Sequence, residues 1–148
     1  MPSYKHTLLI CLFFIFTACS YTNPYKSEKV SFKIPQNEVE KKLHLAFDFG
    51  TVTFSGTSVK INGQETVDLN LAVNDPKFNS RDEIQFAREF AAAVKGYITN
   101  IKHFTVISVD TKVRKNNSFG YSEKMKKTLF DQETLKEITA SQYFHQPK

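Results

Sequence analysis

The chain has 148 residues, which leaves room for one domain, and one domain is the default expectation at this length. Its composition, with 41% hydrophobic and 14% aromatic residues, is typical of a chain that folds around a core. The formal net charge of +5 at pH 7 is mildly basic. A charge of this size favours anionic partners only weakly and says nothing about the fold.

The longest hydrophobic run is residues 8–16, nine consecutive apolar positions near the amino terminus. A membrane-spanning helix needs roughly 20 apolar residues, so this run is too short to span a bilayer stably. A basic residue, Lys5, precedes the run and small residues follow it, as in export signals. The alternative is a buried core helix, but nine bulky residues without a polar face need cover on all sides. We therefore expect residues 1–18 to be a signal peptide.

The segment that follows this run, Phe16-Thr17-Ala18-Cys19, resembles the lipobox of bacterial lipoproteins. Phe16 departs from the aliphatic residue that is usual at its position. The resemblance implies that Cys19 becomes the mature amino terminus and carries a thioether-linked diacylglycerol, often with an amide-linked acyl chain. Two acyl chains give lasting membrane attachment, whereas one is marginal. Ser20 replaces the aspartate that favours inner-membrane retention in some sorting systems, so we expect a cell-envelope protein of the outer membrane.

Processing at this site would leave no free thiol, because the only cysteines are Cys11 and Cys19. No intrachain disulfide and no catalytic cysteine are then expected, and the core alone stabilises the domain. A buried, unmodified Cys19 is the alternative. The mature chain is expected to consist of a lipidated tether over residues 19–29, a domain over 30–140 and a flexible tail over 141–148.

Alternating apolar residues predict strands in the first half of the domain. A short edge strand is expected over residues 30–34, ahead of a proline. A longer strand is expected over 43–54, with a β-bulge at Gly50 where the alternation changes register.

The pair Asn62-Gly63 separates two alternating runs, residues 57–61 and 67–73. Asn-Gly suits the two central positions of a hairpin turn, which need positive φ, so a β-hairpin is predicted. The outward residues of its second strand are polar, namely Thr66, Asp68 and Asn70. One face of the sheet is therefore expected to be exposed to solvent.

One long amphipathic helix is predicted after this hairpin. Ser80 and Glu83 have the spacing of a capping box, and apolar residues recur at helical spacing from Ile84 to Ile101. The apolar stripe covers about half of the circumference, as expected of a helix that covers a sheet.

Strand patterns return after the helix, over residues 104–114, and Asn116-Asn117 is a plausible turn. Residues 119–130 fit either a strand or a helix, and we favour a strand that completes a second hairpin. Asp131 is expected to cap a short helix that ends near Ile138.

These elements predict an α+β fold of two layers, an antiparallel sheet of four to six strands covered on one face by one long helix. The order resembles that of small single-domain lipoproteins of uncharacterised function, over about residues 43–130. The resemblance rests on pattern alone and implies no active site.

No catalytic motif is present, and no cofactor is expected. His44, His103 and His145 lie far apart in the chain, so we expect solvated side chains and no metal site. Asp48 and Asp68 fall on polar strand faces, where an exposed carboxylate is commoner than one member of a catalytic pair.

The one uneven charge distribution lies in residues 112–127, where six bases face a single acid, Glu123. The bases are Lys112, Arg114, Lys115, Lys124, Lys126 and Lys127. They form either a patch for phosphate headgroups, an acidic polysaccharide or an acidic protein, or a lysine-guarded sheet edge that prevents aggregation. Phe119 and Tyr121 interleave with these bases as in nucleic-acid binders, but an exported chain seldom meets nucleic acid, and none is expected as a partner.

The anchor and the absence of a catalytic constellation favour a non-enzymatic envelope lipoprotein whose domain binds a protein or a glycan near the membrane. A hydrolase of envelope polymers and an immunity- or inhibitor-type lipoprotein are the alternatives.

Overall fold

The structure is a computed structural model that describes residues 24–61 and 63–143. The expected signal peptide, Cys19 and the last five residues of the tail lie outside this part of the chain. The six strands within it form one sheet in the order β1-β2-β3-β4-β5-β6. The strands are β1 (Tyr25–Glu28), β2 (Thr51–Ile61), β3 (Gln64–Asn74), β4 (Val106–Asn117), β5 (Gly120–Asp131) and β6 (Glu137–Ile138). The helices are α2 (Gln36–Ala46), α3 (Glu83–Lys95) and α4 (Ala140–Tyr143), with a 3-10 helix, η1 (Ile101–His103).

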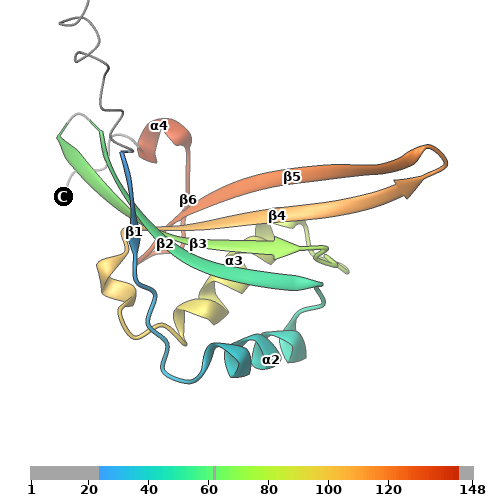
Figure 1. Cartoon of the computed structure of the whole chain (residues 1–148), viewed down its shortest axis with the longest axis horizontal. Coiled ribbons are helices and arrows are strands. Elements are labelled where there is room, and N and C mark those ends of the chain that lie inside the picture. Colours follow the sequence, from blue (N-terminus) through green and yellow to red (C-terminus); the bar gives the residue numbers. More distant parts are fainter. Residues whose placement is uncertain (1–23, 62, 144–148) are drawn as a thin grey trace, which may run out of the picture.

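The elements confirm the α+β class. Helices α2 and α3 lie on one side of the sheet, whereas the short α4 lies on the other (Figure 1). The prediction of a single long covering helix is wrong, because α3 has only 13 residues and shares the apolar side of the sheet with α2.

The sheet is mixed, so the prediction of an antiparallel sheet is also wrong. Strands β3 and β4 pair in parallel, with Leu69 opposite Ile107 and Leu71 opposite Val109, whereas all other neighbouring strands are antiparallel. A parallel pair needs a crossover connection, and α3 provides it by returning the chain to the end at which β3 began.

The core lies between the sheet and the two helices, and phenylalanine rings dominate it. Phe86 and Phe90, one turn apart on α3, stack with their ring centroids 5.7 Å apart. The rings of Phe47 and Phe49 each make a T-shaped contact with Phe90, with centroid distances of 5.2 and 5.4 Å. The buried cluster comprises Val39, Leu43, Phe47, Phe49, Val52, Leu69, Leu71, Val73, Phe86, Ala87, Phe90, Ala91, Val94, Ile98, Phe104, Ile107, Val109 and Phe130.

The strand predicted over residues 43–54 is wrong in its first half. Helix α2 runs through Ala46, and its buried residues Val39 and Leu43 are four positions apart on one helix face. Leu45, which completed the alternating pattern, is 89% exposed. Gly50 is not a bulge but precedes β2, and its backbone N–H donates to the carbonyl of Asn74 at 2.8 Å.

The hairpin between β2 and β3 is confirmed. All eleven residues of β2 pair with residues of β3. Gly63, in the turn, has φ of +83°, a conformation that side chains with a Cβ rarely adopt.

The edge strand expected over residues 30–34 is wrong, since within that segment Phe32 makes only an isolated bridge to Ile98. The edge strand is β1, from the segment expected to be the tether, and it pairs with β2. At the close approach of the two strands, a Cβ on Gly56 would lie 2.5 Å from the carbonyl oxygen of Glu28, so only glycine fits.

Helix α3 differs from the prediction at both ends. Asp82 rather than Ser80 is the N-cap, because its carboxylate accepts the Gln85 N–H at 2.6 Å. The helix ends at Lys95, so Ile98 and Ile101 contact the core from the segment that follows.

Strand β5 confirms the preference for a strand over residues 119–130. The short helix expected after Asp131 is wrong. The Asp131 carboxylate instead accepts the N–H and the hydroxyl of Thr134 in a turn that leads to β6.

We expect Phe90→Ala to lower the free energy of unfolding by about 3–5 kcal/mol, because it opens a cavity between α3 and the rings of Phe47 and Phe49. The matched control is Leu45→Ala on α2, which removes an exposed apolar side chain and should change stability by less than about 0.5 kcal/mol. Urea denaturation of the purified chain measures both. Equal losses for the two variants would contradict this description of the core.

Candidate functional site

Strands β4 and β5 run beyond the rest of the sheet. Strand β3 ends at Asn74, which pairs with Lys112, but β4 and β5 stay paired to Asn117 and Gly120. We call residues 113–124 the ribbon. Five residues on β4 extend it about 16 Å past the end of β3, and Figure 1 shows it projecting from the molecule.

The six predicted bases all lie on β4 and β5 and divide between the two faces of the sheet. The cross-strand register places Lys115, Lys124 and Lys126 on the face that α3 covers, and Lys112, Arg114 and Lys127 on the opposite face, here called the outer face. The charges therefore form two half-patches rather than one. Successive side chains of a strand point to opposite faces, so the sequence alone already indicates that Arg114 and Lys115 lie on different faces.

On the helix face, Glu83 at the start of α3 ties the hairpin to the body of the domain. Its carboxylate accepts the Thr111 hydroxyl at 2.8 Å and lies 3.3 Å from Lys124 Nζ and 3.6 Å from Lys126 Nζ. Burial raises the pKa of Glu83, but these partners together outweigh burial and lower the pKa below its ordinary value. Two of the three bases on this face are thus neutralised by one acid.

On the outer face, Glu123 is the acid that pairs with two of the bases, as Glu83 does on the helix face. It lies 2.9 Å from Lys112 Nζ and 3.1 Å from an Arg114 guanidinium nitrogen, and hydrogen bonds from both bases lower the pKa of Glu123. The guanidinium of Arg114 also stacks over the ring of Tyr121, 4.4 Å from its centroid. These contacts hold Arg114 and Tyr121 in a fixed orientation on the ribbon.

Large apolar side chains are exposed along the same hairpin. Tyr121 is 62% exposed, Met125 is 72% exposed, and Phe119 at the turn is fully exposed. Exposed aromatic and methionine side chains beside an arginine are the composition that protein interfaces favour.

The outer edge of β5 is largely unpaired within the described chain, because β6 covers only Leu129 and Phe130. Lys124, Lys126 and Lys127 lie along the uncovered stretch. Lysines at such an edge deter edge-to-edge aggregation, so this arrangement also fits the lysine-guarded edge.

A second polar cluster lies on the outer face under α4, where Asp68 is only 6% exposed. The exposed Asp68 expected from the sequence is therefore wrong, because α4 covers this part of the sheet. The Tyr143 hydroxyl on α4 donates to Asp68 Oδ2 at 2.7 Å. Burial raises the pKa of Asp68, and the bond from Tyr143 and the charge of Lys127 only partly oppose this.

Asp110 on β4 is a second carboxylate on this face, and burial raises its pKa too, against the charge of Lys127, its cross-strand neighbour. Sequence reasoning missed Glu83, Asp110 and Tyr143 as site residues. The predicted pairing of β4 with β5 could have placed Asp110 beside Lys127. No local feature of the sequence predicts the contact between Tyr143 and Asp68.

The other predicted residues do not converge. The ring of His44, on α2 rather than on a strand, stacks on Phe49 at 3.9 Å, and Asp48 is exposed. His103 lies 3.0 Å from Glu28, and hydrogen bonds from His103 and Ser58 lower the pKa of Glu28. His145 lies outside the described residues. Within residues 24–61 and 63–143, no group of three or more His, Cys, Asp or Glu side chains could hold a metal ion.

Comparison of the chain with protein-family models, with curated proteins and with solved structures finds no match. Among the described residues, no helix is both long and apolar enough to cross a membrane. The case for function therefore depends on the geometry described above.

We expect Glu83→Gln to destabilise the domain by about 1 kcal/mol at pH 7, because it weakens the bond from Thr111 and removes both ion pairs. The folded pKa of Glu83 is lowered, so its stabilisation is present above the ordinary pKa of 4.5 and is lost as the pH falls through the folded value. The gap in unfolding free energy between wild type and variant should therefore close in acid, which urea denaturation from pH 7 to pH 3 measures.

The control is the same substitution in a Lys124→Met, Lys126→Met background, where Glu83→Gln should cost less. An unchanged cost in that background would mean that the lysines do not contribute to the stabilisation.

Proposed function

We propose that this chain is a lipid-anchored lipoprotein of the bacterial cell envelope whose domain binds an acidic protein partner through the ribbon and is not an enzyme. The projecting β4–β5 ribbon is the observation that carries the proposal. It carries bases on both faces and the exposed Tyr121, and the exposed Met125 lies at its base.

The position of the ribbon relative to the proposed anchor supports this function. Tyr25, at the start of β1, is level with Val59 near the β2–β3 turn, whereas the ribbon tip lies at the opposite end of the sheet (Figure 1). The strand register separates the two ends by about 13 residues, or roughly 40 Å. Six residues from Cys19 to Pro24 span at most about 20 Å. The tip is therefore well placed to reach a partner away from the anchor.

The distribution of charge favours a protein over the headgroups of a bilayer. A flat surface can contact only one face of the β4–β5 hairpin, and each face carries only three of the hairpin's six bases. A protein with an acidic groove can contact both faces together with the fully exposed Phe119. Charge complementarity of this kind sets partner choice and association rate.

The carboxylates favour binding over hydrolysis of an envelope polymer. Asp110 pairs opposite Ala72, four residues from Asp68 along β3, which corresponds to about 13 Å along the strands. Glycosidase carboxylates are separated by roughly 5–9.5 Å. Asp68 and Asp110 are therefore poorly placed to act as such a pair.

The anchor is tested by metabolic labelling of the full chain with a palmitate analogue in a bacterial host. We expect Cys19→Ser to abolish labelling, because the lipidated thiol is lost. The matched control, Cys11→Ser, lies within the proposed signal peptide and should leave labelling intact. Labelling that persists without Cys19, or its absence from the wild-type chain, would exclude the proposed anchor.

The ribbon is tested by site-specific photo-crosslinking of the full chain in the cells that produce it. A photoreactive residue in place of Met125 should give one discrete protein adduct, because this side chain lies on the outer face of the hairpin. The same probe in place of Leu45, an apolar residue on α2 that is more exposed than Met125, should give none.

Adding Lys112→Gln and Arg114→Gln should reduce the Met125 adduct severalfold, because an acidic partner loses two of the three cations of the outer face. The adducted partner, identified by mass spectrometry, should be acidic. An adduct that forms equally from position 45, or one that survives the loss of both bases, would contradict the proposed interface.

A further inference from the structure

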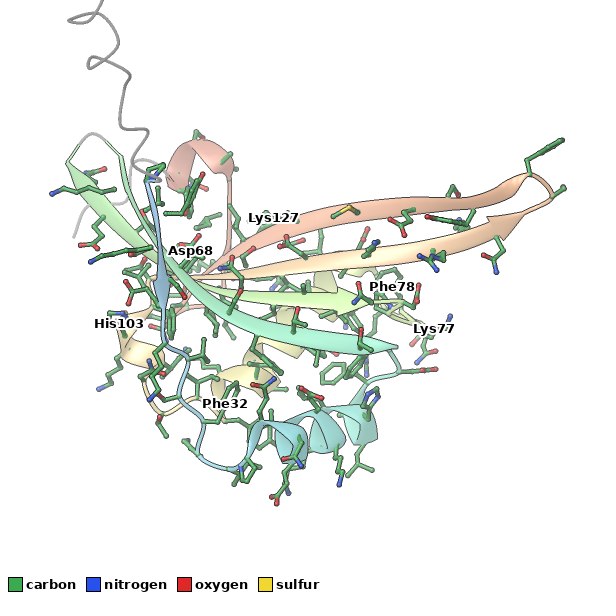
Figure 2. All side chains as sticks on the ribbon, viewed as in Figure 1. Phe32, Asp68, Lys77, Phe78, His103 and Lys127 are labelled. Atoms are coloured by element: carbon green, nitrogen blue, oxygen red, sulfur yellow. The ribbon has the colours of Figure 1, made fainter. Side chains whose placement is uncertain are left out.

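A cavity of about 290 Å³ opens on the outer face beneath α4, at the opposite end of the sheet from the ribbon. Figure 2 shows two of its residues, Asp68 and Lys127, near the point where the strands converge. Strands β1, β2, β3 and β5 and helix α4 all contribute to its wall. The lining residues are Tyr25, Thr57, Val59, Asp68, Asn70, Lys127, Leu129, Ala140 and Tyr143.

The cavity wall contains a hydrogen-bond acceptor that the described chain leaves unused. Oδ2 of the buried Asp68 accepts the Tyr143 hydroxyl, but Oδ1 is buried and has no partner among the described residues. Ser108, the cross-strand neighbour of the lining residues Asn70 and Leu129, likewise has a buried hydroxyl oxygen without a described partner. Buried polar atoms without partners are rare in folded proteins, so these two need a partner that the described chain does not supply, a water molecule or a ligand.

The charges at the cavity select against an ionic ligand. Lys127 contributes a cation to the wall and acts electrostatically on both Asp68 and Asp110. The lining contains one acid and one base, Asp68 and Lys127, so a ligand of either charge is repelled by one of them. A neutral ligand with hydroxyl groups avoids both costs, because a hydroxyl can donate to Asp68 and accept from Lys127.

The remaining wall suits a small ring. Val59 and Leu129 supply apolar surface, and the rings of Tyr25 and Tyr143 supply aromatic surface. The volume lies at the lower end of the roughly 300–1,000 Å³ usual for ligand pockets, so it admits one ring-sized molecule rather than a long chain.

We propose that this cavity binds a small neutral polyol of about the size of one sugar ring. Asp68 and Asn70 bond its hydroxyls, Lys127 donates to it, and the tyrosine rings and Leu129 pack against its carbon face. Because Oδ1 of Asp68 is buried, the ligand displaces a neighbouring group to reach it. This proposal is independent of the ribbon and holds or fails separately from the proposed function.

The test is an NMR titration of the purified full chain in detergent micelles at pH 6. The probes are glucose, which is neutral, glucosamine, which is cationic, and glucuronate, which is anionic. We expect saturable shifts with glucose in the amides of the cavity residues, chiefly Asp68, Lys127 and Tyr143, and weaker responses to both charged analogues. A stronger response to either charged analogue, or no saturable shift with any probe, would overturn the proposal.

Variants separate the cavity from general electrostatics. Asp68→Asn should weaken glucose binding roughly tenfold or more, because a charged acceptor is lost. The matched control is Asp110→Asn, which alters a carboxylate of raised pKa on the same face but outside the lining. It should change the affinity little. An equal loss in both variants would refute the assignment.

Lys127→Met distinguishes a loss of binding from a loss of folding. It removes the donor without touching the Asp68–Tyr143 bond, so it should retain the spectrum of the folded chain and lose affinity for glucose. If Asp68→Asn unfolds the chain, this variant decides alone, and unchanged glucose affinity in it would overturn the proposal.

Discussion

The parallel pairing of β3 with β4 is the constraint on which the rest of the structure depends. Two adjacent strands that run in the same direction need a connection that crosses the sheet, and α3 is that connection. The crossover places Phe86 and Phe90 over the sheet, where they meet the rings of Phe47 and Phe49. An antiparallel β4 would have started at the other end of β3 and needed no such helix.

The same pairing sets where the two candidate sites lie. Because β4 starts level with Asp68 and is longer than the part of β3 that remains, it overruns the sheet and carries β5 with it as the ribbon. The start of β4 and the end of β5 stay within the sheet, where α4 covers Asp68. One long hairpin thus takes part in both sites, the cationic projection at one end and the cavity beneath α4 at the other.

Local chemistry accounts for what the sequence could predict. The pair Asn62-Gly63 between two alternating runs predicted the first hairpin, and the alternation over residues 104–114 predicted β4. Helix α2 escaped prediction because Leu43, Leu45 and Phe47 alternate by coincidence, although only Leu43 and Phe47 are buried. The burial of Asp68 could not be predicted, because it depends on Tyr143, 75 residues away in the chain. The hairpin that carries the six bases was predicted, but the division of these bases between two faces was not, because the prediction did not apply the alternation of side chains along a strand to them.

The attachment of β1 has a mechanical consequence. A load applied at Tyr25 and opposed at the ribbon tip pulls along the strand axis, since β1 lies antiparallel to β2 at the end of the sheet distant from that tip. Such a pull shears the backbone bonds between β1 and β2 together instead of unzipping them one by one. The Glu28 contacts to Ser58 and His103 brace the far end of the strand against slippage. The four-residue β1 can therefore bear a force along the strand axis that would separate it from β2 if the force acted perpendicular to that axis.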